Sequence, residues 1–484
     1  MKTAQQYLDE LPAWSDGTPA ATTPLTGMQL RIFWLACAGK FFEGMVVFMT
    51  GVALPLMSQE FGLTAADKGL VTAASLAGIL LGASLLGGLA DWIGRKKLFV
   101  GEMVIFALFL VALVFAPNFQ IVVLCLFGAG VALGCDYPTA HLIISESIPT
   151  SARGRLVLMA FAFQAVGALV GSFVGFVILF ESSDLGDWRW MYAAAVIPAL
   201  AVIVGRFFVT ESPQWLVSRE RIAEAEHEMR RLLDRKPPYP KSVKLKNPHE
   251  GKKKKPSHYG ALFHQENRRA TILASVPWFL QDLSTYGIGI FTPTILAAII
   301  GAEEAGHGLS AIIHNDMLAA EGSAVMNIFF ILGIIAAIVL VDRVGRMRLQ
   351  VVGFIGCAVG LALAAMSVKP GGGNDMVLLF AGFILFYFMT NLGPNAMTYL
   401  IAGEVFPTRL RGKGAGFAAS IAKVGAVLTA FLFPILLTTI GTVPLLYLLV
   451  GSSVLGAVVT WMSAIETKGL NLEVLEGNHP VEPS

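Results

Sequence analysis

The sequence has few charged residues for its length. Only 14% of its 484 residues are Asp, Glu, Lys or Arg, whereas a typical soluble protein has about 25%. A soluble surface of this size needs more charge than that. This composition therefore excludes a water-soluble enzyme, and it excludes disorder over most of the chain.

Motifs for cofactors and metals are also lacking. The four cysteines fall in apolar stretches without CxxC spacing, so neither a disulfide framework nor a metal cluster is predicted. The chain has no GxxxxGK[ST] nucleotide loop and no readable Ser-His-Asp set. We therefore expect no enzyme activity, no cofactor and no nucleic-acid partner.

Long apolar runs dominate the sequence instead. Hydrophobic residues make up 55% of the chain, and its mean hydropathy is +0.68. A membrane-crossing helix needs about 20 such residues. The sequence predicts an all-α membrane protein with twelve spans, at roughly 31–57, 69–90, 98–116, 121–145, 156–180, 190–209, 270–298, 322–341, 348–367, 376–400, 414–438 and 443–464.

Basic residues indicate the orientation of these spans. Most of the 35 lysines and arginines follow spans 2, 4, 8 and 10 or lie in the central segment 210–269, whereas the opposite loops are acidic. Basic loops stay in the cytoplasm. Both termini are therefore predicted to be cytoplasmic, in a multi-pass protein of a cell membrane, with a bacterial inner membrane favoured.

The central segment divides the chain into two halves. We expect a cytoplasmic tail at 1–27, a six-helix bundle at 28–209, a linker at 210–269, a second six-helix bundle at 270–465 and a tail at 466–484. The linker carries Lys252–Lys255. It is interpreted as a solvated connection that holds orientation, with binding of anionic lipid headgroups as the alternative.

The two halves repeat a signature at their basic ends. Glu, Pro, Thr, Arg and Gly recur at equal spacing from Glu146 and from Glu404, and an Asp-x-x-Gly-Arg pattern starts at Asp91 and at Asp342. Paired bundles that rock about a central site have the alternating-access architecture. Ion pairs at these ends can gate the inward side. The gating candidates are Asp91, Arg95, Glu146, Arg153, Asp342, Arg346, Glu404 and Arg411.

On these motifs the chain resembles the major facilitator superfamily over nearly its whole length. Gly87–Lys97 resembles the loop motif between spans 2 and 3, and Glu211–Leu216 and Glu404–Arg409 resemble the sugar-porter-related branch. The resemblance implies two pseudo-symmetric six-helix bundles, the major facilitator fold, and a monomer. Trp92 stands where a basic residue is usual, and Leu126 stands where span 4 usually has arginine.

Charged residues inside predicted spans are functional candidates, because burying a charge in a bilayer is costly. Lys40 and Glu43 lie three residues apart in span 1, so they either pair with each other or line a cavity. Glu102 lies near the basic end of span 3 and is assigned to the interface. In span 7, Asp282 shares a helix face with two aromatic residues, which suits either a solute site or a packing stripe.

The polar set across spans 4, 5, 7, 10 and 11 is similar to that of the phosphate:proton symporter family. That resemblance implies solute contacts for Tyr137, Gln164, Trp278, Asp282, Tyr286 and Asn395, a charge-partner role for Lys423 at the same site, and a place for Asp136 on the proton path. The family has two aspartates in span 1, where this chain has Phe41, Phe42 and Glu43. Glu43 is taken as a substitute in proton coupling.

The interpretation that follows is a proton-coupled symporter that imports inorganic phosphate or a related anion. A proton on Asp282 would remove its repulsion of an anion and supply a hydrogen-bond donor, which links solute binding to proton binding. The alternative is proton symport of a sugar or an organic-acid metabolite, in which an ionised Asp282 accepts hydroxyl groups. A proton-coupled drug or metabolite exporter is the third candidate.

Overall fold

The computed structural model describes residues 2–11, 23–85, 89–181, 184–234, 243–245, 259–301, 309–368, 375–407 and 410–467. These residues are almost entirely helical, with one isolated bridge between Lys2 and Leu245. The first half contains α2 (Gly27–Phe61), α3 (Ala65–Leu85), α4 (Leu89–Ile93), α5 (Arg95–Val114), α6 (Phe119–Ser147), α7 (Thr150–Glu181), η1 (Leu185–Asp187) and α8 (Trp188–Phe207). The second half contains α11 (Gln265–Gly301), α12 (Leu309–Val344), α13 (Arg346–Met366), α14 (Met376–Leu392), α15 (Pro394–Glu404), α16 (Arg411–Ile440) and α17 (Thr442–Met462).

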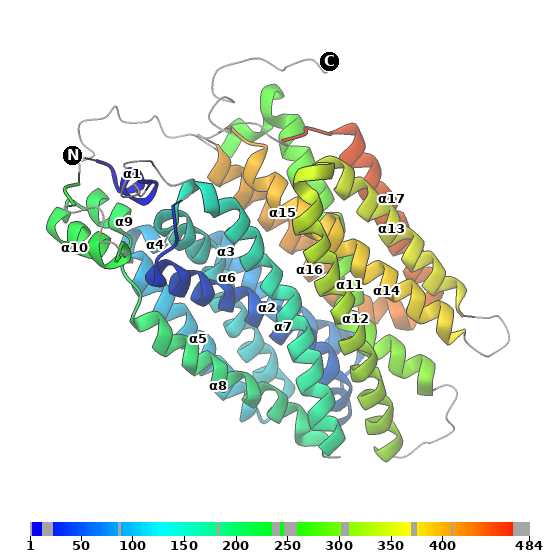
Figure 1. Ribbon diagram of the computed structural model, residues 1–484. Helices are drawn as coiled ribbons and strands as arrows, with labels where there is room; N and C mark the ends of the chain where they lie inside the picture. The colour runs from blue at the N-terminus through cyan, green and yellow to red at the C-terminus, as the bar shows by residue number, and fades with distance from the viewer. Residues whose placement is uncertain are drawn as a thin grey trace.

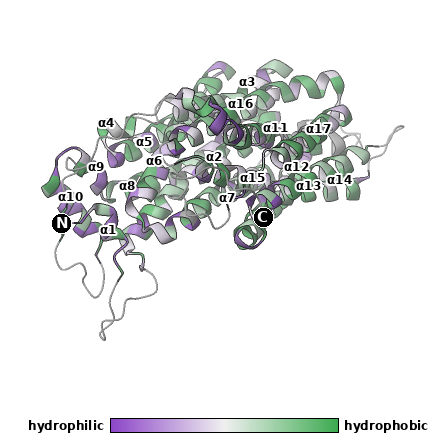
Figure 2. Cartoon of the chain, turned by 90° about the horizontal axis from the view of Figure 1, so that it is seen from above, coloured by the Kyte–Doolittle hydropathy of each residue, from purple (hydrophilic) through white to green (hydrophobic). Residues whose placement is uncertain are grey.

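Eleven helical segments in the described ranges are long and apolar enough to cross a membrane. One of them, Met376–Glu404, joins α14 and α15 through the break at Gly393 and Pro394. The all-α membrane fold predicted from the sequence is therefore confirmed. Large apolar side chains such as Leu108, Ile197 and Trp461 are exposed, and Figure 2 shows hydrophobic residues along much of the perimeter of the bundle. Such a surface suits lipid contact.

The seventh predicted span, α11, is not among those eleven segments. It has 37 residues and carries Gln281 and Asp282 in its middle and Glu266 in its first turn. α11 packs against α2, α12, α15, α16 and α17, and most of its central residues are buried. A helix enclosed by protein can hold polar side chains that a lipid-facing helix cannot.

The helices pack as two sets (Figure 1). Within the first half, α3 and α5 pack on α6, and α2 packs on α7; within the second, α11 packs on α16, and α13 packs on α14 and α17. The two halves meet through α3–α16, α7–α12 and α2–α11. We propose that the domain boundaries follow these two sets, as expected from the sequence.

The acidic loops connect the helices at one end of the molecule, which we call the acidic end. The backbones of the two halves touch on this side. A Cβ atom added to Gly51 of α2 would lie 1.9 Å from the carbonyl oxygen of Ile290 in α11. One added to Gly69 of α3 would lie 2.3 Å from the carbonyl oxygen of Phe431 in α16. Only glycine allows so close a helix contact. The halves are therefore sealed together at the acidic end.

The opposite end carries most of the arginines described below and is called the basic end. There the short helices α1 (Ala4–Leu8), α9 (Pro213–Ser218) and α10 (Ile222–Leu232) cluster beside the first half, and η3 (Tyr259–Phe263) precedes α11 (Figure 1). Leu8 and Leu232 are fully buried, and the carboxylate of Asp9 accepts a 2.7 Å hydrogen bond from the backbone N–H of Thr150.

Part of the segment predicted to be a solvated linker is therefore folded onto the first half. Ala225 and Met229 of α10 pack into the same buried cluster as Tyr7 of α1. Apolar side chains at this spacing give the helix one apolar face. Through this face α10 packs against the first half, and its charged residues lie on the opposite face. Residues 246–258, including Lys252–Lys255, lie outside the described part of the chain.

Candidate functional site

Four oppositely charged side chains meet where the two halves face each other. Lys40 and Glu43 of α2 form an ion pair at 2.5 Å and also line a cavity, so both alternatives left open by the sequence are present. Lys423 of α16 reaches across the interface to Glu43, 3.1 Å away, and to Asp282 of α11, 3.5 Å away. We call these four residues the charge cluster. Two cations balance two carboxylates within it, which limits the cost of burying them.

Tyr286 connects the charge cluster to its neutral surroundings. Its hydroxyl group donates to Glu43 at 2.9 Å and accepts from Lys423 at 2.6 Å and from the amide of Gln164 at 2.8 Å. Tyr286 lies on α11 and Gln164 on α7. Side chains from both halves are therefore joined in one network, as an alternating-access site requires.

Amide side chains form a further hydrogen-bonded chain from α11 to α15 and α14. Gln281 donates to Asn395 at 3.0 Å, and Asn395 donates to Asn391 at 2.5 Å. Asn391 in turn donates to the carbonyl oxygen of Phe330. Asn395 follows directly on the Gly393–Pro394 break, which lets its side chain project from the first turn of α15. Gln281 and Asn391 join the candidates named from the sequence.

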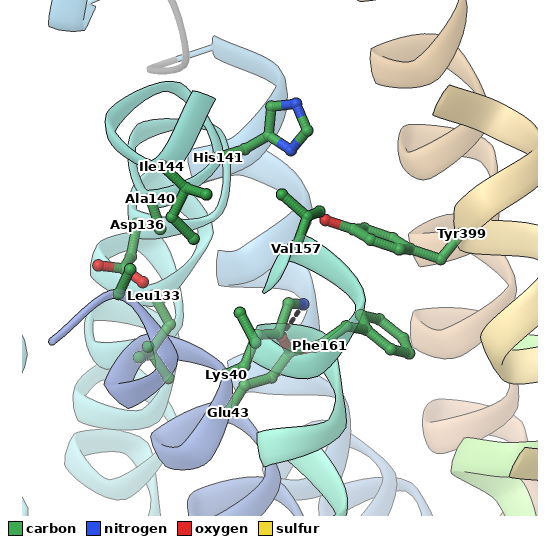
Figure 3. A pocket seen from close by; sticks show the side chains of 13 residues that line it. Lys40, Glu43, Leu133, Asp136, Ala140, His141, Ile144, Val157, Phe161 and Tyr399 are labelled. Atoms are coloured by element: carbon green, nitrogen blue, oxygen red, sulfur yellow. Dashed lines mark hydrogen bonds and ion pairs between the residues drawn. The ribbon is translucent and has the colours of Figure 1, made fainter. Parts of the chain in front are cut away.

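Aromatic rings cover the basic side of the charge cluster. Tyr399 of α15 stacks on Phe161 of α7 with 4.5 Å between ring centroids, and it meets Trp278 of α11 edge to face at 6.2 Å. The ammonium group of Lys40 lies 5.5 Å from the Phe161 ring centroid. Figure 3 shows Tyr399 reaching toward Phe161 from the second half. The sequence analysis did not single out Phe161 or Tyr399, because an isolated aromatic residue in an apolar span resembles ordinary core.

Two cavities adjoin the charge cluster. One is lined by Gln164, Trp278, Asp282, Tyr286, Asn395 and Lys423, together with Lys40. This set contains six of the seven residues that the sequence resemblance assigned to the solute, including the charge partner Lys423. The seventh, Tyr137, lies in α6, and its side chain is outside the described part of the structure. We call this cavity the central cavity.

The second cavity lies on the other side of Lys40 and is lined by Glu43, Asp136, His141, Phe161 and Tyr399 among others (Figure 3). The carboxyl group of Asp136 points away from the Lys40–Glu43 pair in this view. Asp136 instead pairs with Arg206 of α8 at 2.6 Å, and Arg206 also pairs with Glu102 of α5 at 3.1 Å.

Arg206 was missed in the sequence, and Glu102, which was assigned to the interface, has a side chain enclosed by protein. The side chain of Arg206 is 0% exposed and that of Glu102 is 2% exposed. Arg206 lies in the last turn of α8. Arginines at such cytoplasmic helix ends are expected from the rule that basic residues stay in the cytoplasm, so nothing in the sequence indicated that this one is buried. The packing of α5 against α8 encloses both side chains, and sequence spacing gives no sign of that contact.

Charged networks brace the basic end of each half. In the first half, Arg95 of α5 pairs with Glu146 of α6 at 3.1 Å, and the hydroxyl group of Ser212 donates to Glu146. In the second half, Arg346 of α13 pairs with Glu404 of α15 at 3.2 Å and with Asp342 at 3.2 Å. Each of these ion pairs joins helices of one half and does not cross to the other.

Two further glutamates complete these networks symmetrically. Glu211 accepts a hydrogen bond from the backbone N–H of Lys96, and Glu466 accepts one from that of Arg346. Each binds at the start of a helix, where N–H groups lack partners within the helix. Burial raises the pKa of Glu211. These two contacts extend the internal repeat to the segments after α8 and α17, of which the sequence analysis had used the first only as a family motif.

The remaining gating candidates lie at the same end of the molecule. Arg153, near the start of α7, donates to the side-chain oxygen of Gln5 at 2.9 Å. Arg411 begins α16. Asp91 lies in α4, with its side chain outside the described part of the structure. The gating role of all eight residues stays a prediction.

Removing one carboxylate tests that prediction. We expect Glu146→Gln to leave Arg95 without its ionic partner, to lower the unfolding free energy by about 1 kcal/mol and to slow uptake several-fold. Glu404→Gln should act alike in the second half. Thermal unfolding in detergent and uptake by proteoliposomes measure the two effects. Glu228→Gln is the control, since it removes a surface pair with Arg231; equal effects for all three variants would contradict the prediction.

A bundle of long apolar helices in two sets, with buried charges and cavities between them, defines the chain as a polytopic membrane transporter. The family model described as Sugar (and other) transporter matches residues 32–478. The chain therefore belongs to the sugar transporter family of the major facilitator superfamily.

Named relatives agree with this family. The putative metabolite transport protein YaaU of Escherichia coli (strain K12) is 29% identical over 442 residues, covering 91% of this chain and 93% of that protein. The major myo-inositol transporter IolT of Bacillus subtilis (strain 168) is 30% identical over 451 residues, covering 89% and 90%. These comparisons support the sugar-porter branch of the sequence resemblance and leave its phosphate branch unsupported.

The fold is also that of solved transporters. The partially occluded, inward-open structure of the xylose transporter XylE from E. coli superposes with a TM-score of 0.73 at 18% sequence identity. It covers 92% of this chain, and the match spans 100% of the XylE chain. The helical arrangement, including α11 as the helix in seventh position, is therefore that of the major facilitator fold.

Proposed function

We propose that this protein is a proton-coupled symporter that imports a small hydroxyl-rich metabolite, such as a sugar or a polyol, by alternating access. The observation that carries the proposal is the composition of the central cavity. Its lining combines one carboxylate, one indole ring, one phenol and two amides with the ammonium groups of two lysines. Such groups accept and donate hydrogen bonds in turn, as hydroxyl groups require.

The charge cluster disfavours inorganic phosphate as the solute. An oxyanion that sheds water needs cationic donors, and Lys40 and Lys423 supply that charge in the central cavity. Lys40 is already paired with Glu43, and Lys423 with both Glu43 and Asp282. A divalent phosphate anion would exceed the single positive charge that the cluster gains when Asp282 is protonated, and it would compete with Glu43 for the same lysines. A neutral solute instead adds no charge beside these carboxylates, and it can hydrogen-bond Asp282 through its hydroxyl groups and stack on Trp278.

Asp282 is the acid that we expect to take the proton. Glu43 has ion pairs at 2.5 and 3.1 Å and a hydrogen bond from Tyr286, whereas the ion pair of Asp282 with Lys423 is longer, at 3.5 Å. A buried carboxyl group with weaker compensation is more easily neutralised. A proton on Asp282 loosens its attraction to Lys423 and frees donors for the solute, so proton and solute binding support each other.

An organic acid is the second candidate solute, because of the charge balance of the cluster. Once Asp282 is neutral, the charge cluster holds two lysines against Glu43 alone, and this excess positive charge suits one carboxylate. Binding of the proton together with a monovalent anion would then restore neutrality. This candidate keeps the mechanism and changes only the chemical class of the solute.

A competition assay separates these solutes. The purified protein is reconstituted into proteoliposomes that are loaded with a mixture of sugars, polyols and organic acids. Counterflow of each labelled solute is then measured at equal pH on both sides of the membrane. We expect counterflow of a sugar or a polyol that excess phosphate does not inhibit. Counterflow of phosphate, inhibited by none of the sugars and polyols, would contradict the proposal.

A further inference from the structure

Away from the central cavity, α5, α6 and α8 bury a second charged group. Arg206 is 0% exposed and pairs with Glu102 and with Asp136, whose side chains are 2% and 4% exposed. We call these three residues the buried triad. The guanidinium group also donates to the carbonyl oxygens of Phe99 and Leu35 and lies against the Phe99 ring, 3.5 Å from its centroid. Arg206 is thus fixed between the two carboxyl groups.

The charges of the buried triad do not balance if both acids are ionised. Arginine stays protonated in proteins, so the triad would hold one positive and two negative charges. An uncompensated carboxylate in the interior is very costly, and such a group takes up a proton instead. Lys40, the nearby cation on α2, is paired with Glu43.

Contacts of the two acids show where a proton would sit. Both carboxyl groups pair with the same guanidinium group, Glu102 at 3.1 Å and Asp136 at 2.6 Å, and two carboxyl groups that share one cation repel each other unless one of them is protonated. Glu102 Oε2 is buried and has no hydrogen-bond partner among the described residues. One proton held between the carboxyl groups removes the excess charge and supplies the missing donor.

Neighbouring titratable groups do not supply that charge. The thiols of Cys37 on α2 and Cys135 on α6 face the triad acids, and a neutral thiol carries no charge. Across the second cavity lie Lys40, Glu43 and His141. His141 is exposed and Asp136 lines the same cavity, so this cavity places Asp136 of the buried triad on the same space as an exposed residue nearer the end of α6.

We propose that Glu102 and Asp136 share one exchangeable proton beneath Arg206, forming a proton-binding site separate from Asp282 that exchanges with water at the basic end through the cavity beside His141. The central cavity and the identity of the solute play no part in this argument. The site can therefore exist even if the proposed function is wrong.

The charge count gives an unusual expectation for single variants. In Glu102→Gln, one acid and one arginine remain, so Asp136 becomes ionised and the shared proton is lost. In Asp136→Asn, Glu102 becomes ionised for the same reason. Each substitution keeps the size of the side chain. Removing either acid should therefore remove the same protonated carboxyl group.

Infrared difference spectroscopy of the purified protein tests this expectation. A protonated carboxylic acid has a carbonyl-stretch band apart from that of a carboxylate, and an exchangeable proton shifts the band in D₂O. We expect wild type to show such a band that disappears on raising the pH, and we expect Glu102→Gln and Asp136→Asn to lose the same component. Glu60→Gln, which removes an ionised partner of Arg189, should keep it.

Either variant alone is enough to test the proposal. Loss of the component in one folded variant, judged by monodispersity in detergent, supports the proposal even if the other variant does not fold. Retention of every wild-type component in a folded variant overturns it. Absence of any titrating, D₂O-sensitive carboxylic acid band in wild type also overturns it, and none of these results depends on transport.

Discussion

Asp282→Asn should abolish accumulation of solute driven by a proton gradient while leaving exchange at equal pH in place. An amide keeps the shape and hydrogen bonds of a protonated carboxyl group but cannot release a proton. The solute can then cross in both directions without being concentrated. We expect uptake driven by an inward proton gradient to fall to the level without a gradient, with counterflow within about threefold of wild type, a difference below 1 kcal/mol.

Both readouts are needed to interpret this variant. Proteoliposomes are prepared with wild type, Asp282→Asn and Asp342→Asn, the last as a matched change at a surface carboxylate that is 77% exposed. Gradient-driven accumulation by Asp282→Asn equal to wild type would show that Asp282 does not carry the proton. Loss of both accumulation and counterflow would show instead that ionised Asp282 is required for solute binding.

Replacing Lys423 should have the largest effect on stability and transport together. Lys423→Met leaves Glu43 and Asp282 with Lys40 as the remaining cation of the charge cluster. Removing one partner of a buried ion pair typically costs about 3–5 kcal/mol. Transport should fall at least about 100-fold, which corresponds to about 2.7 kcal/mol, since the link between α16, α2 and α11 is also lost.

A double variant separates charge balance from folding in general. Lys423→Met with Asp282→Asn restores equal numbers of positive and negative charges in the cluster, so thermal stability in detergent should recover most of its loss while transport stays low. Lys413→Met, at the start of the same helix, should change little. If Lys423→Met alone unfolds at the wild-type temperature and transports normally, the charge cluster is not the centre of the site.

Much of the architecture could be predicted from the sequence, because membrane spans follow from apolar length alone. Span 7 was located as well, and it corresponds to α11. The i,i+3 spacing of Lys40 and Glu43 left pairing and cavity lining as alternatives, and the structure shows both, with an ion pair at 2.5 Å between two residues that line a cavity. Their meeting with Lys423, however, depends on how α2 and α16 approach, and no spacing within one helix contains that information.

The features that were missed share a physical cause. Arg206 and Glu211 lie at the ends of helices, where charged residues normally face water or fix orientation. Their burial arises from packing between α5 and α8 and from docking of the segment after α8 onto the start of α5. Short helices such as α10 were likewise hidden, because the segment was judged by its charge and proline content rather than by its apolar face.

The most direct test of the account is the movement of protons with the solute. Weakly buffered proteoliposomes containing wild-type protein are mixed with a sugar, a polyol, an organic acid or phosphate without any imposed gradient, and the external pH is recorded. The account predicts alkalinisation on addition of a sugar or a polyol, abolished in Asp282→Asn and unchanged in Asp342→Asn. Alkalinisation with phosphate and with none of the hydroxyl-rich solutes would contradict it.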